Sequence, residues 1–305
     1  MPGATTIMTP VSRRWLERAG IVLTILSVGF VAARLRDAWL AVDLAHISFR
    51  TWIALCGLAC LYALANLLLA LAWRHLLALS GSTVPRSIAI RIYGISQIAK
   101  YVPGNIFHLA GRQALGIADG IPGYHLAKAT LWEIGSLACA AGMFAWLVIP
   151  VLLPTVPVAV AALLVAATVA AVAAALRKTL GPHAAATICN QALFHAIAAT
   201  IFVIVLAMKE AHIPPNAAVT GGAYVLAWLA GLVMPGAPAG LGVREAVLLL
   251  LLHDSTAAGD LMGTVLLGRL VTIAGDTLYF LGAARLQRRY RAISLPARSN
   301  AASHD

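Results

Sequence analysis

Residues 103–112 read Pro-Gly-Asn-Ile-Phe-His-Leu-Ala-Gly-Arg, and residues 235–244 read Pro-Gly-Ala-Pro-Ala-Gly-Leu-Gly-Val-Arg. The two stretches share Pro, Gly, Leu and Arg at equivalent positions, and each joins two apolar runs that are too short to cross a bilayer alone. Helix breaks that lead to a charge are tolerated at membrane depth only where the backbone is buried in protein or lines a wet cavity. Such a break in each half of the chain indicates a transporter-type binding site and a possible inverted repeat.

The composition indicates an all-α polytopic membrane protein. The chain is 61% hydrophobic and 11% charged, and its mean hydropathy is +0.88. We expect one transmembrane domain at 19–284, a cytoplasmic segment at 1–18 and a basic cytoplasmic tail at 285–305. The net charge of +11 is scattered between apolar runs, so we interpret it as topology signals and contacts to anionic lipid, with no nucleic-acid partner.

The lengths of the apolar runs predict about six full spans and two interrupted regions. We interpret the interrupted regions, 87–117 and 219–252, as re-entrant hairpins, each formed by a helix, a Pro-Gly break and a second short helix. The alternative is a set of ordinary kinked spans, about eight in all. A signal peptide at 13–33 is disfavoured, because many spans follow it. The six predicted full spans lie near 19–39, 51–72, 126–149, 156–176, 186–207 and 261–284.

The distribution of basic residues predicts that both termini are cytoplasmic. With the N-terminus inside, alternation through the six spans places most of the 22 Lys and Arg residues on the cytoplasmic side. The first hairpin then enters from the cytoplasm and the second from the outside. The basic residues left on the outer side are Arg34, Arg36, Arg50, Lys209, Arg244 and Arg269.

Both breaks resemble the signatures of a known family, the flippase-like transmembrane region of lysylphosphatidylglycerol synthases. Residues 97–105 with Gly111-Arg112 look like its first motif, and residues 235–236 with 240–245 look like its second. The segment Ala237-Pro238-Ala239 departs from the glycine-rich pattern of that motif. The resemblance implies a bacterial inner-membrane protein that moves or handles lipids, as the best-known members translocate aminoacylated phosphatidylglycerol. The soluble domain that makes that lipid is not in this sequence, so we expect no enzyme activity.

Arg112 and Arg244 are the leading candidates for contact with a lipid headgroup, because guanidinium binds phosphate in a bidentate way. The alternative is that each ties down its own loop. Glu245 adjoins Arg244, although neighbouring side chains on a helix point apart.

The first break brings further candidates. Lys100 either attracts an anionic headgroup or snorkels to the interface, where Tyr101 is also expected. Asn105 is predicted to cap the second half-helix. Gly104, with Gly236 of the second break, admits close backbone approach to a ligand.

Charged and polar residues within the predicted spans form the last group of candidates. Glu133 is expected to pair with Arg112 or Lys128, or to carry a proton that drives transport. Arg269 and Asp276 lie seven residues apart on one helix face, where we expect a polar stripe facing the hairpins. His195 is predicted to be a satisfied packing residue.

Several classes of site are missing from the sequence. The four cysteines show no metal-ligand spacing and are predicted to be buried thiols, and neither a Walker A motif nor a metal or cofactor motif occurs. The sequence therefore favours a lipid transporter whose partner is a phospholipid or a polyprenyl-linked lipid. Two alternatives stay open: a non-transporting partner of a lipid or glycan synthase, and a membrane glycosyl- or phosphotransferase.

Overall fold

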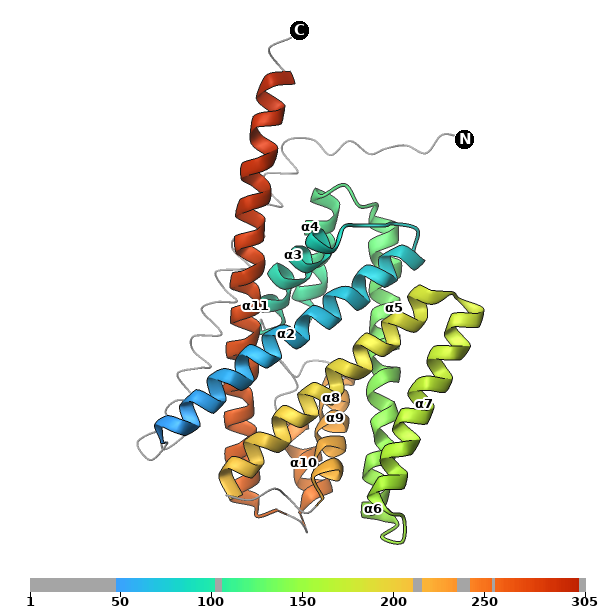
Figure 1. Cartoon of the computed structure of the whole chain (residues 1–305), viewed down its shortest axis with the longest axis vertical. Helices are drawn as coiled ribbons and strands as arrows, with labels where there is room; N and C mark the ends of the chain where they lie inside the picture. Colours follow the sequence, from blue (N-terminus) through green and yellow to red (C-terminus); the bar gives the residue numbers. More distant parts are fainter. Residues whose placement is uncertain (1–47, 102–105, 211–215, 235–241, 254–255, 302–305) are drawn as a thin grey trace.

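The computed structural model describes residues 48–101, 106–210, 216–234, 242–253 and 256–301, and every regular element in these ranges is helical (Figure 1). The all-α prediction is therefore confirmed for the described part of the chain. The elements are α2 (Phe49–Leu79), α3 (Arg86–Gln97), η2 (Ile98–Tyr101), α4 (Phe107–Ala118), α5 (Gly123–Gly142), η3 (Met143–Val148), α6 (Ile149–Leu152), α7 (Val158–Thr179), α8 (Pro182–Glu210), α9 (Ala217–Val233), α10 (Val243–Leu252) and α11 (Ala258–Ala301).

Five helical segments are long and apolar enough to cross a membrane. They coincide with five of the six predicted full spans, and the predicted span at 19–39 lies outside the described residues. The helix α11 continues through residues 285–301, which were predicted to form a separate tail. The five segments are Phe49–Leu79, Gly123–Leu152, Val158–Thr179, Pro182–Lys209 and Gly259–Arg288.

The two interrupted regions have the predicted order of helix, break and short helix. In the first, α3 and η2 precede the break and α4 follows it; in the second, the break separates α9 from α10. Within each region the two helices pack against each other. Figure 1 shows α3 and α4 toward the end of the molecule where α11 finishes, and α9 and α10 toward the opposite end.

Local sequence sets several helix boundaries. Ser48 caps α2 by accepting a hydrogen bond from the Thr51 backbone N–H at 3.2 Å. Prolines immediately precede α3, α5 and α7, where the missing backbone N–H is not needed. Glycines with positive φ follow the ends of α2, α4 and α7, because this conformation is easy only without a Cβ. They are Gly81, Gly120 and Gly181.

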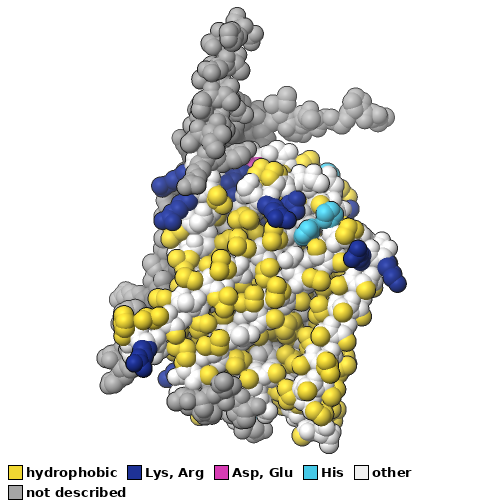
Figure 2. All heavy atoms as spheres, in the orientation of Figure 1, with side chains coloured by type: hydrophobic (Ala, Val, Ile, Leu, Met, Phe, Trp, Pro, Cys, Tyr) yellow, Lys and Arg dark blue, Asp and Glu magenta, His cyan; other side chains and the backbone are white. Residues whose placement is uncertain are grey.

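Basic and apolar residues occupy different parts of the surface (Figure 2). The face in Figure 2 is apolar through its middle, and most of its Lys and Arg side chains gather toward the end that holds α3 and α4. This arrangement agrees with the grouping expected from alternating spans. The four cysteines lie exposed on the outer surface, so the prediction of buried thiols is wrong. Apolar helix surface that faces lipid needs no protein cover, which explains their exposure.

The helices α2 and α11 approach closely at Gly275. A Cβ built there would lie 2.8 Å from the Ala59 carbonyl oxygen and 2.9 Å from Cδ1 of Tyr62. Small residues permit this spacing between membrane helices. Overpacking typically costs about 1–3 kcal/mol, so we expect Gly275→Ala to lower the thermal unfolding temperature in detergent. Gly282→Ala on the same helix is the control, because its added Cβ would meet no described atom within 4 Å. Equal melting temperatures for both variants would contradict the close approach.

Candidate functional site

Helix α11 presents charged side chains to both interrupted regions. Its Arg269 contacts Glu245 of α10, with Nη2 at 2.5 Å and Nε at 3.1 Å from Glu245 Oε1. Two helical turns farther along α11, Asp276 forms an ion pair with Lys100 of η2, with Lys100 Nζ 2.7 Å from Asp276 Oδ2. Arg269 and Asp276 therefore lie on the part of α11 that faces the interrupted regions, and each pairs with a different one.

The cluster around Asp276 is buried and closed. Its carboxylate is fully inaccessible to solvent, and it accepts hydrogen bonds from the Tyr101 hydroxyl and from Asn66 Nδ2, the latter at 3.1 Å. Tyr101 is itself buried, so its predicted interfacial position is wrong. Lys100 was predicted to snorkel or to attract a headgroup, but it points inward to a carboxylate. Charge pairing offsets part of the cost of burying these ions.

Arg112 lies in a second closed cluster. Its Nη1 is 2.5 Å from Glu133 Oε2, and its Cζ lies 3.8 Å from the centroid of the Tyr93 ring. Tyr93 donates its hydroxyl to Glu133 Oε1 at 3.1 Å, and Trp73 lies against the same guanidinium, 5.5 Å from Cζ. Of the two expected partners for Glu133, the structure shows Arg112 rather than Lys128. With the Arg112 side chain 1% exposed, this geometry favours the structural interpretation of Arg112.

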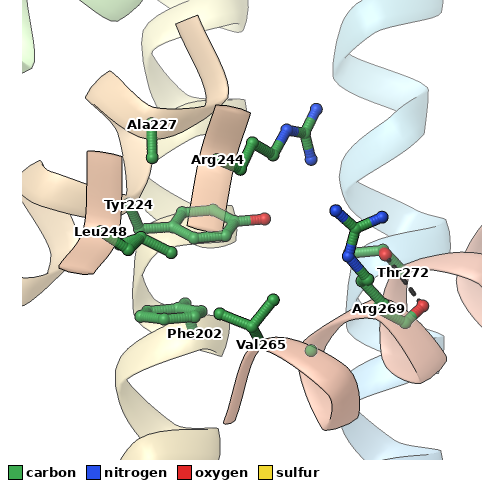
Figure 3. Close-up of a pocket in the computed structure, with 9 residues that line it drawn as sticks. Phe202, Tyr224, Ala227, Arg244, Leu248, Val265, Arg269 and Thr272 are labelled. Carbon is green, nitrogen blue, oxygen red and sulfur yellow. Dashed lines mark hydrogen bonds between the residues drawn. The ribbon is translucent and has the colours of Figure 1, made fainter. Parts of the chain in front are cut away.

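The second interrupted region borders a small cavity of about 30 Å³, lined by side chains from α8, α9, α10 and α11 (Figure 3). Figure 3 shows the guanidinium groups of Arg244 and Arg269 and the hydroxyl of Tyr224 on one side of the apolar wall. The Tyr224 ring stacks on Phe202, with centroids 4.6 Å apart and an interplanar angle of 19°. The volume suffices for a water molecule or two. The residues that line the cavity are Phe202, Tyr224, Ala227, Arg244, Leu248, Val265, Gly268, Arg269 and Thr272.

Arg244 differs from the other buried cations in its partners. Its Nε is buried without a hydrogen-bond partner among the described residues. Its Cζ lies 5.9 Å from the centroid of the Trp228 ring, and no carboxylate of the described residues forms an ion pair with it. A buried guanidinium without an anion is costly unless a ligand completes its contacts. Within the described residues, the cavity lining therefore includes one guanidinium nitrogen, Arg244 Nε, without a hydrogen-bond partner.

Glu245 is fixed from two sides. Its Oε1 accepts from Arg269, and its Oε2 accepts the Gly242 backbone N–H at 2.8 Å. Gly242 has φ +83°, a conformation that glycine adopts without strain, and this turn starts α10. As expected for adjacent helical residues, Glu245 pairs with Arg269 and not with Arg244. The carboxylate thus neutralises one of the two arginines.

Some predicted site residues are not placed. Gly104, Asn105 and Gly236 lie outside the described residues, and the N-cap position of α4 falls on Ile106. Sequence reasoning missed Tyr224, Phe202 and Thr272. No local pattern marks them, because they come from three helices that meet only in the folded protein. Tyr224 lies twenty residues before Arg244, a separation that carries no recognisable spacing.

A buried polar face on α8 is also incompletely satisfied. Gln191 donates Nε2 to Ser136 Oγ at 2.9 Å, but its Oε1 has no partner among the described residues. The same holds for Nε2 of His195, which is packed edge-on against Trp228 with centroids 4.8 Å apart. The prediction that His195 is a satisfied packing residue is therefore wrong for one ring nitrogen. Buried polar atoms of this kind are typical sites of internal water.

The described residues contain no group of three or more His, Cys, Asp or Glu that could hold a metal ion. Comparison with family models and with curated proteins found no match to this chain.

Proposed function

We propose that this protein is a multi-pass transporter of the bacterial inner membrane that moves a lipid with an anionic headgroup. The observation that carries the proposal is Arg244, a half-buried arginine that lines the cavity, whose Nε is buried and which has no counter-ion among the described residues. Arg269 and the Tyr224 hydroxyl lie around the same space (Figure 3). Two guanidinium groups and a phenol offer the donors that a phosphate accepts. The lipid chains would remain in the bilayer.

Helix lengths support re-entrant hairpins. At 1.5 Å per residue, the twelve residues of α3 or α4 reach about 18 Å and the ten residues of α10 about 15 Å. The hydrocarbon core is about 30 Å thick, so none of these helices spans it alone. The two pairs lie toward opposite ends of the molecule (Figure 1). We infer that they enter from opposite sides as an inverted pair, the first from the cytoplasm, where both termini also lie.

The cavity must widen to admit a headgroup, since it now has room for only a water molecule or two. The surrounding contacts suit such a change. Phe202 and Tyr224 are held by ring stacking and apolar packing, whereas Arg112 and Lys100 of the first interrupted region are held in ion pairs with Glu133 and with Asp276 of α11. We therefore place the headgroup at the second hairpin and assign the first a supporting role.

Reconstitution into liposomes tests this function. The purified protein should accelerate transbilayer movement of a labelled anionic lipid relative to protein-free vesicles. The assay would compare phosphatidylglycerol, aminoacylated phosphatidylglycerol and a polyprenyl-phosphate lipid. If folded protein moves none of them, transport by this chain is contradicted. The alternatives would then be a synthase partner, tested by co-purification, and a membrane transferase, tested by headgroup turnover.

A further inference from the structure

The charge of the cavity bears on which headgroup it accepts. Two guanidinium groups line it, from Arg244 and Arg269, and one carboxylate, Glu245, is bound to Arg269. Asp276 lies farther along α11 and is balanced by Lys100. The remaining titratable groups near Arg244 are the phenols of Tyr62, Tyr101 and Tyr224, which are uncharged near neutral pH. The described groups around the cavity therefore sum to one positive charge.

The Glu245 carboxylate is held in place, so its negative charge remains at the cavity. The Gly242 N–H holds Oε2 at 2.8 Å while Arg269 holds Oε1, so the carboxylate is anchored by both the backbone and an ion pair. Leaving this position would expose an unpaired amide at the start of α10 and free a second guanidinium. Because leaving would break hydrogen bonds to a charged group at both oxygens, the carboxylate stays when an anion enters.

We infer that Glu245 is a specificity-determining residue that restricts this cavity to headgroups with a single negative charge, such as phosphodiesters; this inference rests on the proposed function. A phosphodiester at Arg244 brings the buried site to neutrality. A phosphomonoester carries about −1.5 to −2 at pH 7, so it would leave excess negative charge beside the Glu245 carboxylate. Uncompensated charge is disfavoured in a small, mostly apolar cavity, where few waters can solvate it.

The test measures binding of short-chain phosphatidylglycerol and short-chain phosphatidic acid to the full chain in uncharged detergent. Wild type should bind phosphatidylglycerol more tightly at pH 8, with a preference on the order of tenfold, equivalent to about 1.4 kcal/mol. Glu245→Gln keeps the shape and one acceptor oxygen, which can serve either Gly242 or Arg269, and removes the charge. It should reverse or abolish that preference by gaining affinity for phosphatidic acid. The control Asp260→Asn removes one carboxylate near the start of α11, outside the cavity lining, and should behave as wild type.

A second measurement does not need the variant to fold. The second ionisation of a phosphomonoester has a pKa near 6, so lowering the pH from 8 to about 5.5 converts phosphatidic acid largely to its monoanion. Wild type should then bind phosphatidic acid more tightly, while its affinity for phosphatidylglycerol stays nearly constant. Binding of neither lipid would overturn the proposed function itself. Binding of both lipids equally at pH 8, or an unchanged preference in folded Glu245→Gln, would overturn only the role of Glu245.

Discussion

Replacing Arg112 with alanine should destabilise the folded protein by about 3–5 kcal/mol, the usual cost of breaking a buried ion pair from one side. The change leaves the Glu133 carboxylate buried with only the Tyr93 hydroxyl as a described side-chain donor. It also removes the guanidinium from the Tyr93 and Trp73 rings, where cation–π contact adds to the loss. Thermal or denaturant unfolding of the purified protein in detergent measures the effect.

A paired substitution separates charge from packing at this site. Arg112→Met combined with Glu133→Leu removes both charges and keeps apolar volume, so it should recover most of the stability lost in Arg112→Ala. Replacement of a buried ion pair by apolar residues is often neutral or stabilising. Wild-type stability in Arg112→Ala would show that the pair contributes nothing to the fold. Arg112 would then regain its place as a candidate lipid contact.

Replacing Arg244 with alanine should abolish accelerated lipid movement while leaving thermal stability unchanged or slightly raised. Hydrogen bonds to charged groups contribute about 1.5–3 kcal/mol each, so losing a bidentate contact lowers headgroup affinity by tenfold or more. Stability does not fall, because the side chain has no carboxylate partner among the described residues and its buried Nε is unpaired. Liposome transport and melting temperature, measured on the same preparation, check both parts.

Two comparison variants sharpen this result. Arg244→Lys keeps the charge but loses the planar fork, so it should retain only part of the transport rate. Arg177→Ala removes an exposed arginine at the end of α7 and should leave transport intact. Normal transport by folded Arg244→Ala would contradict the proposal that the headgroup binds at the second interrupted region. Loss of both transport and folding would instead assign Arg244 a structural role.

The two arginines show what a matching motif can and cannot predict. Arg112 and Arg244 occupy the same position after their Pro-Gly breaks, so the local sequence predicts the same role for both. In the structure, Arg112 meets Glu133 from α5, whereas Arg244 meets a cavity wall and no described carboxylate. No residue pattern in the sequence near either arginine predicts this difference. The difference arises from which helices happen to pack against each break.

The positions of Arg269 and Asp276 on α11 could be predicted from the sequence, but their partners could not. The seven-residue spacing of Arg269 and Asp276 correctly places them on one helix face toward the hairpins, because helical periodicity is a local property. Their partners, Glu245 and Lys100, could not be read from the same spacing. Each ion pair joins residues from separate segments, and such contacts depend on how the helices cross.

The sequence by itself determined the membrane class, five candidate spans in the described ranges and the order of the helices on either side of each Pro-Gly stretch. These follow from apolar run length and from proline and glycine, which act on the backbone within a few residues. Only the tertiary structure decided which buried charges are paired, and that Phe202, Tyr224 and Thr272 join the two arginines around a cavity. Side-chain pairing is a property of helix packing, since a buried charge is satisfied by whichever group the neighbouring helix presents.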